Sequence, residues 1–279
     1  MGIGGADSGA AARGRRAGAI FGGIAAAGLG WGWFEAGWAR FRLLDVPIPG
    51  LPAELDGLRI AHLSDFHLGV PSRGSRAVEA AVEWTANREP DLVAITGDLL
   101  THPRGEAQLR ELVERLPQPV YAVLGNHDLA IARDPLARPS NLRELAPATL
   151  LRDEGSLLEL RGRTVWIAGR LPRRDAVDPN TLAREADLRI LLAHFPRTVD
   201  RLEPDRFDLV LAGHMHDGQI TIPYPGGKVR LAHLSARYPR GLYQTETAVM
   251  HVSPGLGTTF VPFRFGARPE ATELVLRSA

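Results

Sequence analysis

Short apolar runs alternate with segments of helical periodicity from residue 58 to the C-terminus. Apolar residues recur three and four positions apart in residues 75–88 and 105–116, which predicts two amphipathic helices. The remaining apolar runs are four to six residues long and end at glycine, proline or polar residues, as is typical of strands. These runs cover residues 58–63, 92–96, 120–124, a hairpin of 157–160 with 164–168, 188–193, 207–212, 247–252 and 272–276. Because strands and helices interleave, we expect one α/β layered domain over residues 55–279.

The first 40 residues follow a different pattern. Residues 17–34 are uncharged, contain six glycines and come after Arg13, Arg15 and Arg16. Eighteen helical residues rise about 27 Å, which matches the apolar thickness of a bilayer. We therefore expect residues 1–40 to form a basic region and one hydrophobic transmembrane helix, and residues 41–54, rich in turn formers, to form a linker.

The arginines also predict an orientation for this segment. Basic residues mark the cytoplasmic side of a span, so the residues after about 40 are expected outside the cytoplasm, held at the cell membrane. Trp31, Trp33 and Trp38 are typical of anchors at the membrane surface. Arg15-Arg16 suggests the alternative of export through a twin-arginine-type signal, and a buried helix of the domain is a further alternative.

Composition narrows the chemistry. The 279 residues are 44% hydrophobic and 23% charged, which is typical of a globular protein. The absence of cysteine excludes disulfides, thiolate zinc sites and a cysteine nucleophile, so any metal has to be bound through nitrogen and oxygen. A formal net charge of +1 gives no reason to expect nucleic acid, and nothing in the sequence indicates a protein partner.

Polar residues follow five of the predicted strands, at the point where each strand ends. The carboxyl ends of strands in an α/β sheet line its binding crevice, so these side chains should converge although they are far apart in the sequence. They are Asp65, His67, Asp98, Asn126, His127, Asp128, His194, His214 and His216.

This donor set is suited to metal binding. Carboxylates, an amide and imidazoles without sulfur favour two divalent ions of the Mn, Fe, Zn or Co type. The spacing of two between Asp65 and His67, and between His214 and His216, points both side chains of each pair the same way. Asp98 is the best candidate for a carboxylate that bridges both ions.

The order of these motifs resembles the calcineurin-like metallophosphoesterase superfamily. The motifs are Asp65-x-His67, Gly97-Asp98, Gly125-Asn126-His127-Asp128, His194 and Gly213-His214-x-His216. The tail between Val252 and Glu270 resembles the bacterial membrane-associated branch that contains the phosphodiesterases YaeI and YkuE. The resemblance implies a four-layer α/β/β/α sandwich with a dinuclear site at the top of its two sheets.

The resemblance also implies a role for each residue. Asp65, His67, Asp98 and His216 would hold one ion, and Asp98, Asn126, His194 and His214 the other. His127 would be the non-ligand histidine beside the phosphoryl group, with Asp128 as its orienting partner.

Motifs and chemistry together indicate a metal-dependent hydrolase of phosphoric esters. We expect attack by a hydroxide that bridges the ions, with His127 donating a proton to the leaving oxygen. A membrane tether favours a phosphodiester or pyrophosphate in a membrane or envelope component, such as a lipid like UDP-2,3-diacylglucosamine. A broad-specificity phosphomonoesterase and a non-catalytic metal-binding module are the alternatives.

Three further features are open to interpretation. Asp217 stands where the branch usually has glycine, and we expect its carboxylate close to the ions. The cluster of Arg170, Arg173 and Arg174 fits either a contact to a phosphate or lipid head group or a solvated loop. His62, inside the strand at 58–63, is expected to pack beneath the site and not to bind metal.

Overall fold

The centre of the molecule consists of two six-stranded mixed sheets, seen in a computed structural model that describes residues 7–279, with side chains described from residue 19 onward. The strands of the first sheet lie in the order β1 (Arg40–Ile48), β14 (Glu270–Ser278), β2 (Arg59–Leu63), β3 (Leu92–Thr96), β4 (Val120–Val123) and β5 (Thr149–Leu150). The second sheet has the order β12 (Gly241–Gln244), β13 (Val249–Val252), β9 (Leu209–Ala212), β8 (Leu188–Ala193), β7 (Arg163–Arg170) and β6 (Glu154–Leu160).

Parallel pairing dominates the middle of each sheet. Strands β2 to β5 run parallel to one another, and so do β7, β8, β9 and β13. The antiparallel pairs are β14 with β2, β6 with β7 and β12 with β13, the second of which is the hairpin expected from the sequence. This arrangement places the carboxyl ends of the parallel strands of each sheet at one edge.

The inner faces of the two sheets share a core. Ile60 and Leu92 from the first sheet pack in one cluster with Ile190 and Leu209 from the second, and all four are fully buried or nearly so. Both faces of β3, β4 and β9 are covered, which explains why these strands are continuously apolar in the sequence.

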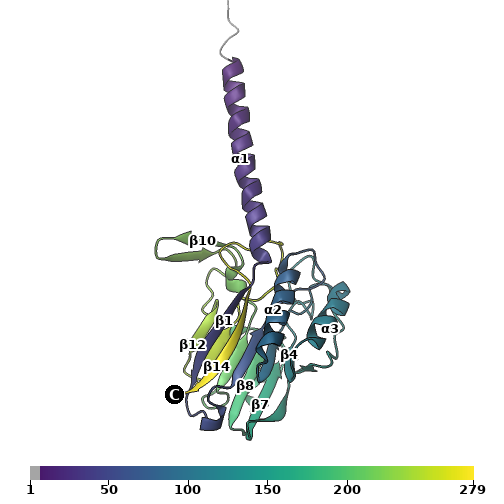
Figure 1. The fold of residues 1–279 in the computed structure, drawn as a ribbon, viewed down its shortest axis with the longest axis vertical. Helices are drawn as coiled ribbons and strands as arrows, with labels where there is room; N and C mark the ends of the chain where they lie inside the picture. The colour runs from purple at the N-terminus through teal and green to yellow at the C-terminus, as the bar shows by residue number, and fades with distance from the viewer. Residues whose placement is uncertain (1–6) are drawn as a thin grey trace, which may run out of the picture.

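Helices α2 (Gly74–Arg88) and α3 (Glu106–Glu114) cover the outer face of the first sheet (Figure 1). Val78 and Val82 of α2, with Leu109 and Val113 of α3, form the apolar faces that the sequence pattern predicted.

The outer layer on the second sheet differs from the expected layer of α-helices. Within the described residues it consists of loops and the 3-10 helices η3 (Pro179–Leu182) and η4 (Pro196–Arg201), whose Leu182 and Val199 pack near Val210. A proline opens each of these short segments, and they are too short to nucleate a stable α-helix. Other 3-10 helices are η1 (Ala53–Leu55), η2 (Pro103–Gly105) and η5 (His216–Gly218).

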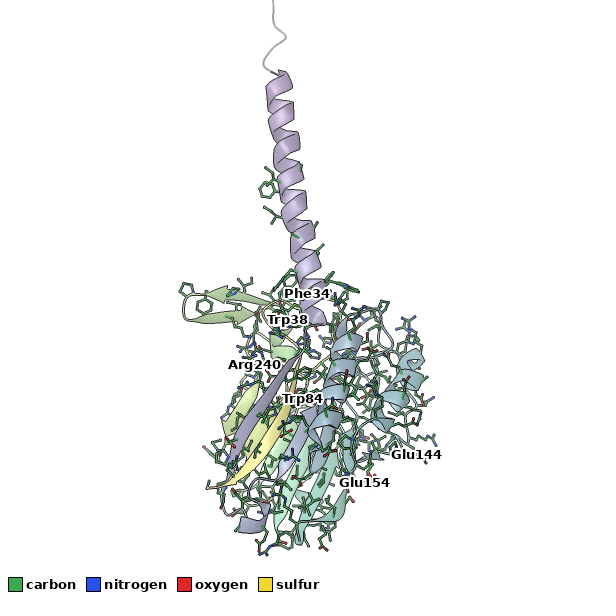
Figure 2. The ribbon with its side chains drawn as sticks, in the orientation of Figure 1. Phe34, Trp38, Trp84, Glu144, Glu154 and Arg240 are labelled. Carbon is green, nitrogen blue, oxygen red and sulfur yellow. The ribbon has the colours of Figure 1, made fainter. Side chains whose placement is uncertain are left out.

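Residues 41–54 do not form the expected linker. Most of them belong to β1, which pairs in parallel with β14 at the edge of the first sheet. Phe41 stacks on Trp84 of α2, which Figure 2 labels, with ring centroids 5.2 Å apart. Pro47 is compatible with an edge strand, whose outer side needs no ladder hydrogen bond, so the prolines here indicated a turn-rich linker incorrectly.

The N-terminal helix α1 (Asp7–Ala36) includes the predicted helical segment 17–34 and projects away from the sheets (Figure 1). In the part of the chain that the structure describes, no helix combines the length and apolar character needed to cross a membrane. The side chains of Arg13, Arg15 and Arg16 lie outside the described residues. Glu35 joins the helix to the domain, because its buried carboxylate accepts a hydrogen bond from the Ala267 amide at 3.1 Å.

A separate hairpin of β10 (Thr221–Tyr224) and β11 (Gly227–Arg230) stands beside the base of α1 (Figure 1). Its residues Ile222 and Tyr224 are about half exposed, at 54% and 55%. The sequence pattern did not indicate these two strands.

A pair of buried histidines joins the sheets beneath the carboxyl ends of the strands. His62 Nδ1 on β2 lies 2.8 Å from His251 Nδ1 on β13, and His62 Nε2 lies 2.9 Å from Thr96 Oγ1. This confirms the expectation that His62 packs beneath the site. Burial lowers the pKa of both rings, that of His251 to about 3, so both are neutral in the folded protein near pH 7.

This pair predicts a loss of stability in mild acid. Below the ordinary histidine pKa of about 6.5 the unfolded chain binds protons that folded His251 does not, so the unfolding free energy should fall by about 2 kcal/mol for this residue between pH 7 and pH 5. Denaturant titrations across this range should show a shallower pH dependence for His251→Gln than for the wild type. Equal slopes would contradict the assignment.

Candidate metal centre

The first cluster of candidate ligands lies where β2 and β9 end. The loop after β2 carries Asp65 and His67, and the loop after β9 carries His216. His216 Nε2 lies 3.0 Å from His67 Nε2 and 3.2 Å from Asp65 Oδ1, and all three side chains are buried. The structure therefore brings together donors that are about 150 residues apart, as the sequence predicted.

The second cluster lies at the ends of β3, β4, β8 and β9. His194 Nε2 is 3.2 Å from Asp98 Oδ2, 3.0 Å from Asn126 Oδ1 and 3.2 Å from His214 Nδ1. Asp98, His194 and His214 form one group whose ligand atoms could hold a metal ion, and Asp65, His67 and His216 form another. Every residue that the sequence singled out as a ligand thus belongs to one of two adjacent clusters.

Asp98 lies between these clusters. Its Oδ2 is 3.2 Å from His194 Nε2 on one side and 3.5 Å from His67 Nε2 on the other. Its Oδ1 accepts a hydrogen bond from the His127 amide at 2.8 Å, which fixes the carboxylate. This is the position that a carboxylate bridging two ions has to take.

The protonation of His194 tests whether the cluster suits a cation. Its Nδ1 lies 2.8 Å from the carbonyl oxygen of Thr96 and must donate to it, so Nε2 of the neutral ring carries a lone pair. That lone pair faces oxygens of Asp98 and Asn126, which are acceptors as well. A positive charge is needed at this point, and either a proton or a metal ion can supply it.

The local charges agree with this need. Burial by itself lowers the pKa of His194, but the Asp98 carboxylate outweighs burial and raises the pKa to about 9. Burial also lowers the pKa of His214, with the charge of His194 adding to the effect, to about 3. One ring therefore carries the compensating proton while the next stays neutral, and a divalent ion could replace that proton.

Contacts behind the ligands orient their rings. His67 Nδ1 lies 2.9 Å from Thr101 Oγ1. The fully buried Arg264 donates to His216 Nδ1 at 3.0 Å and to the carbonyl oxygens of Gly257, Pro254 and Ala267. Ligation through His216 Nε2 would require this contact with Nδ1 to loosen, because the ring has to carry its proton on Nδ1. The sequence motifs gave no sign that Arg264 contacts a ligand, because its segment lies 48 residues from His216.

Glycines in the motifs allow the loops to approach the carboxylates. A Cβ atom at Gly125 would lie 2.0 Å from Asp98 Oδ1, and one at Gly213 would lie 2.0 Å from Ser64 Oγ and 2.4 Å from Asp65 Oδ2. No side chain fits at either position. The motif glycines are therefore required by contact with the acidic residues of other loops.

Asp128 does not orient His127, in contrast to the expected role. Its carboxylate accepts hydrogen bonds from the amides of Leu99, Leu100 and Gly125 at 3.1, 2.8 and 2.8 Å. Burial and the nearby Asp98 raise the pKa of Asp128 to about 7. It ties the loop that carries Asp98 to the loop that carries Asn126, because unpaired amides at these buried strand ends would be costly.

His127 has other neighbours instead. Its Nε2 lies 3.2 Å from Thr259 Oγ1, which donates to Asp134 Oδ2 at 3.1 Å. Its Nδ1 is buried without a hydrogen-bond partner among the described residues, and Nε2 is 4.0 Å from Asp98 Oδ2. Thr259 and Asp134 could not be identified from the sequence, since neither lies in a recognisable motif and they are 125 residues apart.

Asp217 is buried but is held by cations of its own. Its carboxylate contacts Lys228 Nζ, Arg230 Nε at 2.8 Å and Arg240 Nη1 at 3.3 Å. The carboxylate expected close to the ions therefore has its charge compensated by cations of β11 and of the loop before β12. Asp217 connects the hairpin to the loop that carries His214 and His216.

The sequence is similar to those of several known proteins over most of its length. The chain is 30% identical to YkoQ of Bacillus subtilis, an uncharacterized metallophosphoesterase, over 80% of this chain and 84% of that protein. It is 27% identical to the phosphodiesterase YaeI of Escherichia coli, covering 88% of this chain and 89% of that protein. A bovine transmembrane protein with a metallophosphoesterase domain is 31% identical over 85% of this chain, which spans 56% of that longer protein.

A family model gives the same result. The model for calcineurin-like phosphoesterases matches residues 58–218, more than half of the chain, and this range contains both clusters of ligands. The fold, the ligand geometry and this match agree with the resemblance drawn from the motifs. The chain is a metallophosphoesterase and belongs to the calcineurin-like phosphoesterase family.

Proposed function

We propose that this protein hydrolyses phosphodiesters with two divalent cations. In this proposal Asp65, His67, Asp98 and His216 hold one ion, and Asp98, Asn126, His194 and His214 hold the other. The observation that carries the proposal is the convergence of acceptor atoms on both sides of the buried Asp98 carboxylate, where only positive charge can compensate them. The similarity to YaeI, a phosphodiesterase, supports a diester as substrate.

The cations would neutralise charge on the phosphoryl oxygens and make hydroxide available near neutral pH. In this proposal His127 is the residue that transfers the proton. Its Nε2 is the nitrogen nearer to the centre, 4.0 Å from Asp98 Oδ2 and 3.2 Å from Thr259 Oγ1, whereas Nδ1 lies 4.0 Å from Asp134 Oδ2. Burial lowers the pKa of His127, so the ring is neutral before substrate binds, and the negative charge of a phosphate ester favours its protonation. The protonated ring can then donate from Nε2 to the leaving oxygen, with Nδ1–H facing Asp134.

We also propose that the substrate is part of a membrane or of the cell envelope. Helix α1, which projects away from the domain (Figure 2), exposes Ile20, Phe21 and Ile24 at 63%, 72% and 65%. Trp31 and Trp38 are about half exposed near its base, and tryptophan is enriched at membrane–water interfaces. The name of the bovine relative agrees with a membrane setting. A lipid-linked diester or pyrophosphate would reach the metal centre from that surface.

Substitutions in the centre should separate metal binding from proton transfer. Asp98→Ala removes a ligand from both ions and should nearly abolish turnover of bis(para-nitrophenyl) phosphate. His127→Ala should retain two ions and lower the rate by about 100-fold or more. Elemental analysis and steady-state kinetics with Mn, Fe, Zn and Mg would check this. Two ions per chain in the Asp98 variant would contradict the proposed bridge. If the wild type cleaved para-nitrophenyl phosphate faster than the diester, a phosphomonoesterase would be favoured.

Asp128 and Asp134 should act in different ways. Asp128→Asn has one oxygen to accept from three amides, so the ligand loops should loosen and metal affinity should fall by about tenfold or more. Asp134→Asn should leave metal affinity intact and change the pH dependence of kcat, because it alters the chain of contacts to His127. Metal titration and pH profiles would distinguish the two roles. Normal metal affinity in Asp128→Asn would show that the loops do not depend on it.

The membrane proposal predicts the location of the C-terminus. A reporter fused after Ala279 should be active only outside the cytoplasm, because the arginines that precede residue 17 favour the cytoplasmic side. The triple variant Ile20→Glu, Phe21→Glu, Ile24→Glu should shift the protein from the membrane fraction to the supernatant while the domain remains folded. Reporter activity in the cytoplasm, or an unaltered distribution of the triple variant, would refute this part of the proposal.

A further inference from the structure

A cavity of about 560 Å³ opens beside the second cluster of ligands. His214 lines it, so the cavity borders the second cluster of ligands. Its most frequent lining residue is arginine, and no aspartate or glutamate lines it. The six arginines are Arg170, Arg173, Arg174, Arg197, Arg201 and Arg237.

Most of these arginines lack an acidic partner. Arg173 pairs with Asp153 and Asp175, and Arg237 pairs with Asp200. In contrast, Arg170, Arg174, Arg197 and Arg201 have no carboxylate oxygen within 4.0 Å among the side chains from residue 19 onward. Elsewhere the chain neutralises buried or clustered charge, as Asp217 does for three cations. The cavity therefore gathers four arginines that have no carboxylate in ion-pair contact.

Arg170 shows that part of this charge is built into the fold. It is the last residue of β7, only 7% exposed, and its guanidinium donates only to the carbonyl oxygens of Val177 and Leu171, at 3.3 and 3.4 Å. Burial and the neighbouring Arg201 lower its pKa, although Asp153 and Asp178 oppose this. Arg170 and Arg201 both line the cavity, so an anion bound there can be shared by their guanidinium groups.

We propose that this cavity binds a second anionic group of the substrate, a phosphate or similar oxyanion that is separate from the phosphoryl group at the metal centre. This inference rests on the proposed function and defines its substrate more closely: a phosphodiester or pyrophosphate that carries a further multiply charged group near the scissile bond. Guanidinium groups recognise phosphate through paired, charge-assisted hydrogen bonds. A compact ligand is favoured over a nucleic-acid strand, because the formal net charge of the chain is only +1.

Two matched substrates test the inference. Thymidine 5′-(para-nitrophenyl phosphate) and its 3′-phosphorylated form share one scissile bond and differ by one phosphate group. In the wild-type protein kcat/KM should be about tenfold or more higher for the phosphorylated form, as expected for one or two charged hydrogen bonds. Arg197→Ala with Arg201→Ala should reduce this ratio to near one. The control Arg115→Ala with Arg143→Ala removes the same charge from exposed arginines outside the cavity and should keep the ratio.

Binding of the products separates this inference from the proposed function. Calorimetry should give a tighter Kd for thymidine 3′,5′-bisphosphate than for thymidine 5′-monophosphate in the wild type and the control, but not in the cavity variant. If no ester is hydrolysed with any metal and this preference remains, the proposed function fails and the inference stands. A wild type without preference would overturn the inference. An equal loss of kcat/KM on both substrates in the cavity variant would also overturn it, because the cavity would then bind the scissile phosphate. Tighter, salt-sensitive binding of a DNA oligonucleotide would overturn it as well.

Discussion

The buried carboxylate of Asp98 is the group on which the rest of the site depends. It is 1% exposed and has imidazoles of both clusters within 3.5 Å, so it joins donors from both sheets. An ionised carboxylate at this depth is stable only if positive charge and hydrogen bonds surround it. The loops that carry the ligands have to be held against one another to provide this charge and these hydrogen bonds. Cross-loop contacts do this, since His127 donates its amide to Asp98 and His214 donates its amide to Asp65.

These contacts are made by unusual backbone. Asp65, His67, Asp98, His214 and His216 all have φ between 47° and 71°, in the left-handed region that residues with side chains rarely adopt. Such conformations persist only where the surrounding structure determines them, and they gather at functional sites. Here Asp128 supplies one determinant, because its three bonds to amides hold the turns after β3 and β4. The same bonds explain why the residue beside His127 is acidic although it does not touch that ring.

Positive charge is arranged in two different ways on either side of the centre. Lys228, Arg230 and Arg240 are neutralised by Asp217, which fastens the hairpin to the ligand loop. The cavity beside His214 holds arginines that mostly have no such partner. A substrate anion can use the second group and not the first. The difference depends on Asp217. The sequence shows that an aspartate stands at this position, but it does not show which cations its carboxylate faces.

The sequence by itself determined the strands and helices that carry the site and the residues that converge there. Apolar runs such as residues 92–96 and 188–193 could be read directly, because both faces of these strands are buried over most of their length. Each ligand follows such a run, so the rule that parallel strands end at one edge was enough to bring them together. Only the tertiary structure decided the contacts that depend on direction and on distant partners. Three examples are the residues beside His127, the cations around Asp217 and the pairing of β1 with β14. In each case the partners are distant in the sequence, by between 11 and about 230 residues. Local pattern carries no information about which of these partners a side chain faces, because packing of the whole chain selects it.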